Sequence, residues 1–404
     1  MATLQQENGG GQPSQATGIS SARAYLNLLN ALSGIGVLST PYALSEGGWV
    51  CLMLLFVMAS VSCYTMFLLK RCMDTNPRIH SYSDFGKFAF CRRGWMTTSV
   101  VLYLGCYLLA TEFMILEGDN LAKLFPGFEI SKPMLEGRKA FVIVSAIAIF
   151  PTVWLRGLGP LAYIAVAGDL TPILLLSAIL WLAFFDGIVF HQGRKFANLK
   201  GMPTAASIYA TCFSAHATFP LVYSTMKDRK KSSSMLVISF ATVAVICGAM
   251  ALSGYLMFGD QVKAQITLNL PPKNISSAIA IYASIATPFA KYALVVTPIV
   301  IAIEEATPLC KHRPMSLLIR TLLVVSTVIV ALTFPFFGYL LALIGSSISC
   351  TVSLLLPCLF YLKITNGLKG FRAEVVLISG ILGMGLCIAV SGTYISMKRI
   401  VQSL

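Results

Sequence analysis

Residues 30–41 read Asn-Ala-Leu-Ser-Gly-Ile-Gly-Val-Leu-Ser-Thr-Pro and lie inside an otherwise apolar segment, 22–45. A helix that crosses a membrane needs about 20 mostly apolar residues, so this segment is long enough to cross one. Gly34 and Gly36 weaken the helix near its midpoint, and the Ser33 hydroxyl can satisfy backbone groups that an interruption would leave free. The stretch therefore predicts a membrane helix that is broken in the middle of the bilayer.

A second apolar segment, 204–226, has a similar interruption. It contains Ala-Thr-Cys-Phe-Ser-Ala-His-Ala-Thr-Phe-Pro (210–220), in which Ser214 and His216 flank the midpoint Ala215. The midpoints of the two segments are 181 residues apart. Glycine and proline also occur in membrane helices simply because they allow close packing. The matched positions of the two interruptions favour a functional interpretation.

The composition excludes several classes of protein. Of the 404 residues, 56% are hydrophobic and 11% are charged, whereas a soluble chain has about 45–50% and about 25%. So few charges could not cover the surface of a soluble enzyme, a nucleic-acid-binding protein or a disordered scaffold. The net charge of +14 comes mostly from short loops between apolar segments, where basic residues orient a membrane protein.

Segments of spanning length recur along the whole chain. We predict an all-α integral membrane protein with eleven transmembrane helices, at 22–45, 47–69, 95–118, 138–154, 158–185, 204–226, 233–258, 275–303, 315–334, 336–362 and 373–396. A proline, Pro335, forms a predicted tight turn between the ninth and tenth helices; if it only kinks one continuous helix, the count is ten. Residues 1–21 are polar and rich in Gly, Gln and Ser, and are predicted to form a disordered cytosolic tail without a signal peptide.

The distribution of basic residues orients these helices. With the N-terminus in the cytosol, 18 of the 30 Lys and Arg residues fall on the cytosolic side and 11 on the other, and Lys291 lies within a helix. Five helices occupy 22–185 and five more occupy 204–362, so the second group enters the membrane from the opposite face. Each group begins with an interrupted helix, which predicts an inverted repeat with a substrate site at mid-membrane. Segment 373–396 is an additional eleventh helix.

Ionisable residues within the predicted helices form a second group of candidates, because a charge at the bilayer centre costs at least about 2.5–3.5 kcal/mol. Glu112 can carry a proton or pair with another helix, and Asp169 can act in transport or cap a kinked helix. His216 lies at the second interruption and titrates near neutral pH, although a lone membrane histidine often serves packing. Lys291, at the centre of the eighth helix, can replace a bound cation or extend towards the membrane surface.

The sequence contains no pattern typical of an enzyme. Eleven cysteines are scattered without metal-type spacing, and we find no nucleophile constellation, so we expect no catalytic residue, metal or cofactor. An ion channel would need a pore-lining ring or a repeated filter, and neither occurs. Tyr107 faces one side of the third helix and can form the wall of a pocket or pack in the core.

The chain resembles the amino acid/auxin permease family, and most closely its vacuolar amino-acid transporter branch. The motifs that carry this resemblance occur in order along nearly the whole chain: Leu-Asn-Ala-Leu-Ser-Gly-Ile-Gly-Val-Leu-Ser-Thr-Pro-Tyr-Ala-Leu (29–44), Ile-Leu-Glu-Gly-Asp-Asn-Leu (115–121), Phe-Ser-Ala-His-Ala-Thr-Phe-Pro (213–220), Gly-Tyr-Leu-Met-Phe-Gly-Asp (254–260), Gln-Ile-Thr-Leu-Asn-Leu-Pro (265–271), Thr-Pro-Phe-Ala-Lys-Tyr-Ala-Leu (287–294) and Leu-Pro-Cys-Leu-Phe-Tyr-Leu-Lys (356–363).

The resemblance implies a LeuT-like fold with five-plus-five inverted repeats, and proton-coupled movement of neutral amino acids across the vacuolar membrane. It implies substrate contacts at the two interruptions, namely at Ser33, Gly34, Ile35, Gly36, Phe213, Ser214 and Ala215. Ala215 stands where the family often has glycine, which puts the identity of the substrate in question. The expected partners are the amino acid, protons and the lipid bilayer, with no nucleic acid and no obligate protein partner.

Two alternatives remain open from the sequence. An amino-acid-sensing membrane receptor on the same fold would bind substrate without useful flux. The protein could also reside in the plasma membrane instead of the vacuolar membrane. For proton coupling, Lys291, His216 and Glu112 are the candidates, and we favour Lys291 because a buried ammonium requires more explanation than a neutral imidazole.

Overall fold

The computed structural model describes residues 19–127, 137–154, 171–185, 195–271, 274–306, 313–334, 336–365 and 372–403. Over these residues the chain is all-helical, and its one β-type contact is an isolated bridge between Ile19 and Met226. Asp169, most of the predicted tail and the first part of the predicted fifth helix lie outside the described residues.

Eight helical segments of the described residues are long and apolar enough to cross a membrane. They are Val50–Thr75 (α3), Tyr82–Leu124 (α4), Gly137–Trp154 (α5), Arg229–Gln261 (mainly α10, Ser232–Phe258), Ile275–Ala306 (α11), Pro314–Thr333 (within α12, Arg313–Thr333), Phe337–Ile364 and Ala373–Ser403 (within α15, Arg372–Ser403). The segment Phe337–Ile364 consists of α13 (Phe337–Ile344), two π-helical turns (Gly345–Ser349 and Thr351–Leu355) and α14 (Leu356–Ile364). A shorter apolar helix, α7, covers Thr171–Phe185.

Large apolar side chains cover the outside of these helices. Ile147 on α5, Phe184 on α7 and Val390 on α15 are 63%, 72% and 65% exposed. Contiguous apolar surface of this kind is rare on a protein that is surrounded by water. The exposed faces therefore fit a lipid environment, in agreement with the class predicted from composition.

Two further segments form interrupted helices, at the positions that the sequence predicts. The first consists of α1 (Ser21–Leu32), a break at Ser33 and Gly34, a 3-10 turn (Ile35–Ser39) and α2 (Thr40–Gly47). The second consists of α8 (Met202–Cys212) and α9 (Phe219–Thr225), with six residues between them. Proline occupies the first turn of both α2 and α9, where its missing N–H leaves no hydrogen bond unmade.

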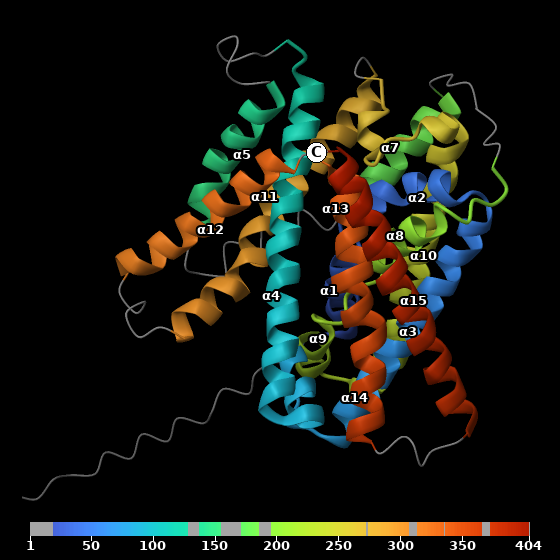
Figure 1. Ribbon diagram of the computed structural model, residues 1–404, viewed down its shortest axis with the longest axis vertical. Helices are drawn as coiled ribbons and strands as arrows, with labels where there is room; N and C mark the ends of the chain where they lie inside the picture. The colour runs from blue at the N-terminus through green and yellow to red at the C-terminus, as the bar shows by residue number, and fades with distance from the viewer. Residues whose placement is uncertain are drawn as a thin grey trace, which may run out of the picture.

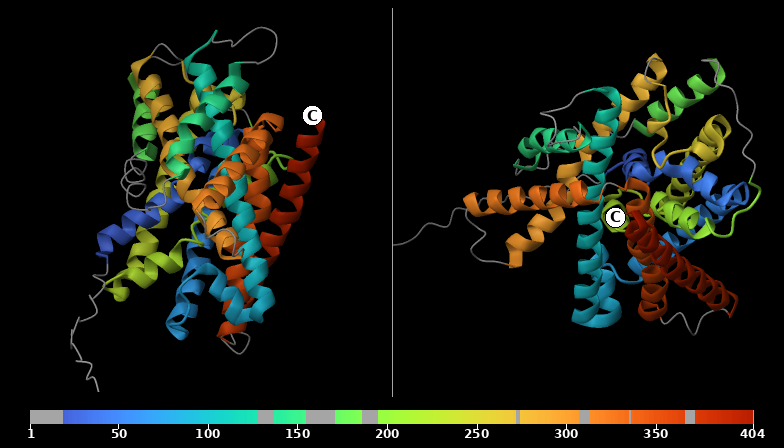
Figure 2. Two further views of the ribbon diagram at one scale, coloured as in Figure 1. Left: turned by 90° about the vertical axis from the view of Figure 1, so that its left-hand side faces the viewer. Right: turned by 45° about the horizontal axis from the view of Figure 1, so that its top comes forward.

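The long helices run between two opposite ends of the molecule, which can be identified by their contacts. At one end, the Ile19 amide donates to Thr225 O at 2.8 Å and the Lys227 amide donates to Ile19 O at 3.1 Å. At the other end, Arg399 forms an ion pair with Glu46 at 2.7 Å. We call these the Ile19 end and the Glu46 end. The C-terminus lies far from the start of α4 (Figures 1 and 2).

Helix α4 separates two groups of helices. α5 and α12 lie on one side of it and α13, α14 and α15 on the other, while α11 crosses it and also packs against α7 (Figure 1). Near the Ile19 end α4 bends sharply at Phe90 and Cys91, where Cys91 has a φ of 57°. Gly86 and Gly94 meet across this bend, since a Cβ on Gly94 would lie 2.2 Å from Gly86 O. Only glycine allows the helix to fold back this closely.

Two predicted boundaries are wrong. The tail predicted for 1–21 extends too far, because Ile19 pairs with Met226 and α1 begins at Ser21 with its N-terminus capped by the Ser20 hydroxyl. The eleventh helix, predicted to end at 396, continues to Ser403. Its last turns are held at the Glu46 end by Arg399, whose guanidinium also lies 5.9 Å from the centre of the Tyr339 ring. Local sequence could not predict the contacts of Ile19 with Met226 or of Arg399 with Glu46, because each joins residues far apart in the chain.

The two ends of the molecule allow a direct test of topology. Arg78, after α3, and Lys200, before α8, are both exposed and lie at opposite ends. We expect Arg78→Cys and Lys200→Cys, each in a background without native cysteines, to react with a membrane-impermeant maleimide from opposite sides of sealed vesicles. Permeabilised vesicles, in which both must react, provide the control. Labelling of both from the same side would contradict this fold.

Candidate substrate site

A small cavity lies against the break in the first interrupted helix. Its volume is about 20 Å³, which is enough for about one water molecule. It is bordered by Ser33, Gly34, Ile35, Val37 and Leu38 of the interrupted helix, Leu116 of α4, Thr171, Pro172 and Leu175 of α7, and Ser284 and Thr287 of α11. Three predicted substrate residues, Ser33, Gly34 and Ile35, therefore border one cavity.

The lining of this cavity is uncharged and mostly apolar, with a few hydroxyl groups. Hydroxyl groups come from Ser33, Thr171, Ser284 and Thr287, and the other lining residues are apolar or glycine. The 3-10 turn begins at Ile35, and the first amides of a helix have no partner within it. These amides and the helix dipole favour a negative group at the break. The cavity thus suits a small ligand that carries a carboxylate and has no net charge.

Gly34 and Gly36 have different roles at the break. Gly34 is extended, with φ −79° and ψ −171°, and a Cβ placed on it would meet nothing within 4 Å. A Cβ on Gly36 would lie 2.8 Å from the Cys212 Sγ and 3.3 Å from the Cys212 amide nitrogen. Gly36 therefore brings the first break into contact with the end of α8, while Gly34 leaves the cavity open.

The predicted residues of the second break do not border this cavity. Phe213 is buried and stacks on Phe240 of α10, with ring centroids 6.3 Å apart. The Ser214 amide donates to Thr211 O at 3.3 Å, and Ala215 O accepts from the Thr218 amide at 3.1 Å. These contacts stabilise the break itself, so a role in binding stays a prediction for these three residues.

His216 is buried against α3. Its Nε2 lies 2.9 Å from the Thr65 Oγ1 and 3.1 Å from Ser62 O, while Nδ1 has no hydrogen-bond partner in the described part of the chain. The imidazole thus connects the second break to α3, and it does not border the cavity.

Lys291 and Glu112 extend the faces of two cavity-lining helices. Lys291 is half-buried on α11, four residues after Thr287 and seven after Ser284, so it shares their helix face. Glu112 is fully buried on α4, one turn before Leu116, and its carboxylate has no hydrogen-bond partner in the described residues. Tyr107, also on α4, is half-buried and does not border the cavity.

Sequence reasoning missed several residues. Thr171, Ser284 and Thr287 border the cavity, and the one available signal was the occurrence of hydroxyl side chains three residues apart in an apolar helix. Glu117 is as fully buried as Glu112 and also has no hydrogen-bond partner within the described residues. It lies in the motif 115–121, where a carboxylate within an apolar helix was the available signal.

A polar cluster joins several segments at the Glu46 end. Gln265, in the segment between α10 and α11, donates to the Asp119 Oδ2 at 2.8 Å and accepts from the Asn120 Nδ2 at 3.0 Å. Arg138 of α5 pairs with the other oxygen of Asp119. The Ser39 hydroxyl donates to Ala264 O at 2.5 Å. The segment around Gln265 is therefore attached both to α4 and to the interrupted helix, and we call residues 259–271 the plug.

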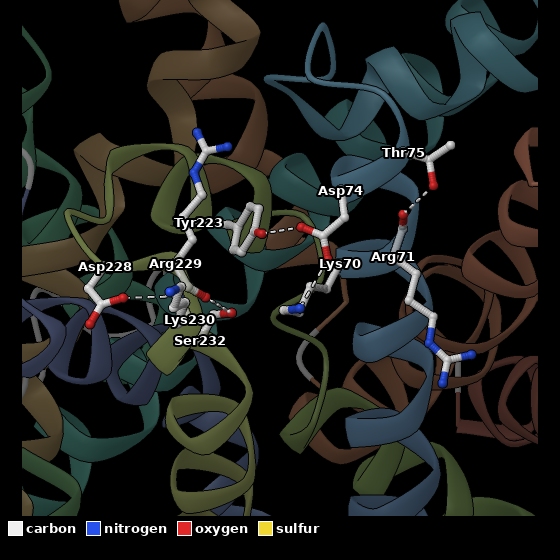
Figure 3. A network of polar contacts seen from close by, with 9 residues as sticks. All are labelled: Lys70, Arg71, Asp74, Thr75, Tyr223, Asp228, Arg229, Lys230 and Ser232. Atoms are coloured by element: carbon white, nitrogen blue, oxygen red, sulfur yellow. Dashed lines mark hydrogen bonds and ion pairs between the residues drawn. The ribbon is translucent and has the colours of Figure 1, made fainter.

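A second polar cluster lies at the Ile19 end (Figure 3). The Tyr223 hydroxyl of α9 donates to Asp74 of α3, and Lys70 pairs with the same carboxylate at 3.0 Å. The Arg229 guanidinium lies 5.2 Å from the centre of the Tyr223 ring. These contacts join the end of the second interrupted helix to α3.

The described residues gather no group of three or more His, Cys, Asp or Glu side chains that could hold a metal ion.

Comparison with known proteins identifies relatives along nearly the whole chain. Residues 17–398 match the family described as "Transmembrane amino acid transporter protein". Amino acid transporter AVT1I of Arabidopsis thaliana is 44% identical over 381 residues, which cover 93% of this chain and 94% of the relative. Amino acid transporter AVT1J of the same plant is 41% identical and covers 92% and 89%. Amino acid transporter AVT3B, also of Arabidopsis thaliana, is 27% identical over 402 residues, which cover 94% of each chain.

The different surroundings of the two glycines predict different effects on stability. Gly36→Ala should lower stability by about 1–3 kcal/mol, because the added methyl group overpacks the contact with Cys212. Gly34→Ala should leave stability unchanged or raise it by up to about 1 kcal/mol, because its methyl group meets nothing. Thermal unfolding of the purified protein in detergent measures both.

The double variant Gly36→Ala with Cys212→Ala tests the cause. It removes the sulfur from the close contact and should recover part of the loss. Equal effects of Gly34→Ala and Gly36→Ala would contradict the contact.

Proposed function

Because the chain belongs to the transmembrane amino acid transporter family, we propose that it is a proton-coupled secondary active transporter of neutral amino acids in the vacuolar membrane. The observation that carries the proposal is the uncharged cavity at the break in the first interrupted helix, whose mostly apolar lining includes four hydroxyl groups. A neutral amino acid is a zwitterion, so a site without charged side chains can bind it through backbone groups and helix ends.

Two features support an inverted-repeat architecture. The interrupted helices begin near Ser21 and Met202, and each is followed by helices long enough to cross the membrane. Together with α7, they would complete the eight long segments to eleven spans, in two groups of five and one additional helix. Broken helices at matching positions of two repeats are typical of secondary transporters that bind substrate at mid-membrane.

The break suggests an orientation for the substrate. We place the carboxylate at the first amides of the turn that begins with Ile35, and the ammonium at the carbonyl ends of α1 and α8. The hydroxyls of Ser284 and Thr287 supply further polar contacts from α11. The side chain would point towards Leu116 and Leu175.

The two polar clusters support alternating access. The cavity of about 20 Å³ is too small for an amino acid, and a polar cluster joins helices at each end of the molecule. Binding therefore requires the cavity to expand, and opening requires one cluster to break. The plug governs the Glu46 end, and the Tyr223–Asp74 contact governs the Ile19 end.

The charge distribution and the relatives support a vacuolar location and an orientation in the membrane. Exposed basic residues gather at the Ile19 end, among them Arg23, Lys227, Arg229 and Lys230, which favours this end as cytosolic. The resemblance to vacuolar transporters supports the vacuolar membrane. The relatives AVT1I, AVT1J and AVT3B all carry the name of amino acid transporter, which favours transport over a receptor role.

Flux through purified protein tests the function directly. Liposomes that contain the protein should accumulate a labelled neutral amino acid when a pH gradient of one sign is imposed, and should lose that accumulation when a protonophore is added. Liposomes without protein and protein with Gly34→Leu, which fills the cavity, are the controls. Saturable binding without flux under either gradient would instead support the receptor alternative.

Coupling is tested by substitution at the three candidates. Lys291 shares the cavity-facing side of α11, so we expect Lys291→Met to lower gradient-driven accumulation at least tenfold while exchange of labelled for unlabelled amino acid continues. His216→Gln should keep gradient dependence, because His216 contacts α3 and not the cavity.

Glu112→Gln, in the same assay, separates a second route for the proton. Glu117→Gln is the matched comparison, because Glu117 is buried on the same helix. Full accumulation in Lys291→Met would leave the lysine a structural role, and loss in His216→Gln alone would assign coupling to the histidine.

A further inference from the structure

A second and larger cavity lies at the Glu46 end, on the outer side of the plug. Its volume is about 310 Å³, and its walls include Tyr42, Asp119, Lys263, Leu268, Phe336 and Tyr339. This volume is at the lower end of the range for sites that bind small molecules, about 300–1,000 Å³. It is more than ten times the volume of the cavity at the break.

The two cavities are separate. They share no lining residue. Ala264 and Gln265 of the plug form the wall of the larger cavity, and Gln265 is fully buried between that cavity and α4. The Ser39–Ala264 hydrogen bond attaches this wall to the interrupted helix at 2.5 Å. A ligand in the outer cavity would therefore rest on the plug without entering the inner cavity.

The charges around the outer cavity leave a cation available. Asp119 is compensated by its ion pair with Arg138 and by the hydrogen bond from Gln265. The Lys123 ammonium is directed to Thr267 O at 2.9 Å. Lys263 is exposed, and its ammonium has no carboxylate within 4 Å in the part of the chain that the structure describes. Lys263 can thus bind an incoming carboxylate.

Part of the lining of the outer cavity is aromatic. The Phe336 and Tyr339 rings lie 5.9 Å apart, and Tyr42 and Leu268 add to the same lining. Aromatic rings offer large apolar area with little loss of conformational freedom on binding. A ligand with a carboxylate at one end and a large apolar group at the other would match both features of the lining.

We propose that the outer cavity is a second amino-acid binding site, which selects neutral amino acids with large apolar or aromatic side chains. The carboxylate binds Lys263, and the side chain packs on Phe336 and Tyr339. The ammonium faces Asp119, whose oxygens can accept further hydrogen bonds beside those of Arg138 and Gln265. This inference deepens the proposed function and rests on it only for the identity of the ligand class.

The site has a consequence for opening of the plug. Asp119 holds the plug through Gln265, and the same carboxylate would face the bound ammonium. A ligand in the outer cavity competes for Asp119 and thereby weakens one attachment of the plug. The outer site would thus be occupied before the Glu46 end opens.

Equilibrium binding of labelled L-phenylalanine to the purified protein in detergent tests the proposal. The wild-type protein should bind two molecules per chain, and Lys263→Gln or Phe336→Ala should remove one or weaken it at least tenfold. Gly34→Leu, which fills the inner cavity, should retain one molecule. Lys200→Gln, an exposed lysine elsewhere at the Glu46 end, is the matched control and should bind like the wild type.

The outcomes separate the two proposals. One molecule per wild-type chain, with no change in Lys263→Gln and Phe336→Ala, would overturn the outer site. Labelled glycine should bind at the inner site alone, so two molecules of glycine per chain would also overturn the stated selectivity. Flux of amino acid into liposomes that contain the wild-type protein is measured separately. Absence of flux would overturn the proposed function. The number of molecules bound per chain would still decide whether the outer site exists.

Discussion

The structure depends on one constraint, which is that backbone N–H and C=O groups inside a membrane must find hydrogen-bond partners within the protein. An interruption such as Ser33–Gly34 breaks that pattern and is tolerated only where it is buried in protein or borders a polar cavity. The cavity beside Gly34 meets this condition, and the hydroxyls of Ser284 and Thr287 come from a helix far away in the chain. The backbone groups that make the break energetically costly are also the groups that the proposed substrate would bind.

Close packing gives the break its position. Gly36 lies against Cys212, so the first interrupted helix touches the end of α8 just before the second break. At the Glu46 end, Glu46 is held by Arg399 from the last helix and by Asn198 from the segment before α8. Parts of the chain more than 350 residues apart are thus attached to one turn of α2. A movement of this turn would therefore displace both interrupted helices and the plug.

Charged groups are used sparingly and in two ways. Most ion pairs of the described residues lie at the two ends, where water and headgroups can solvate the charges. Three of them, Arg71–Glu374, Arg138–Asp119 and Arg399–Glu46, connect different helices. Inside the bundle, Glu112 and Glu117 have no hydrogen-bond partner among the described residues. Such groups persist in membrane helices mainly when they serve transport, since their insertion is costly. The inner cavity itself stays free of charged side chains, which suits a ligand of zero net charge.

The sequence by itself determined the membrane class, the positions of the long helices and the two interruptions, because length, apolar composition and glycine content act locally along the chain. It also indicated Ser33, Gly34 and Ile35 at the inner cavity. Only the tertiary structure decided that Thr171, Ser284 and Thr287 complete the lining, that His216 contacts α3, and that α15 continues to Arg399 and beyond. The reason is physical: a local pattern reports whether a segment is helical and which face is apolar, but it does not report which helix packs against that face. Gln265 and Asp119 meet across 146 residues, and no local periodicity encodes that distance.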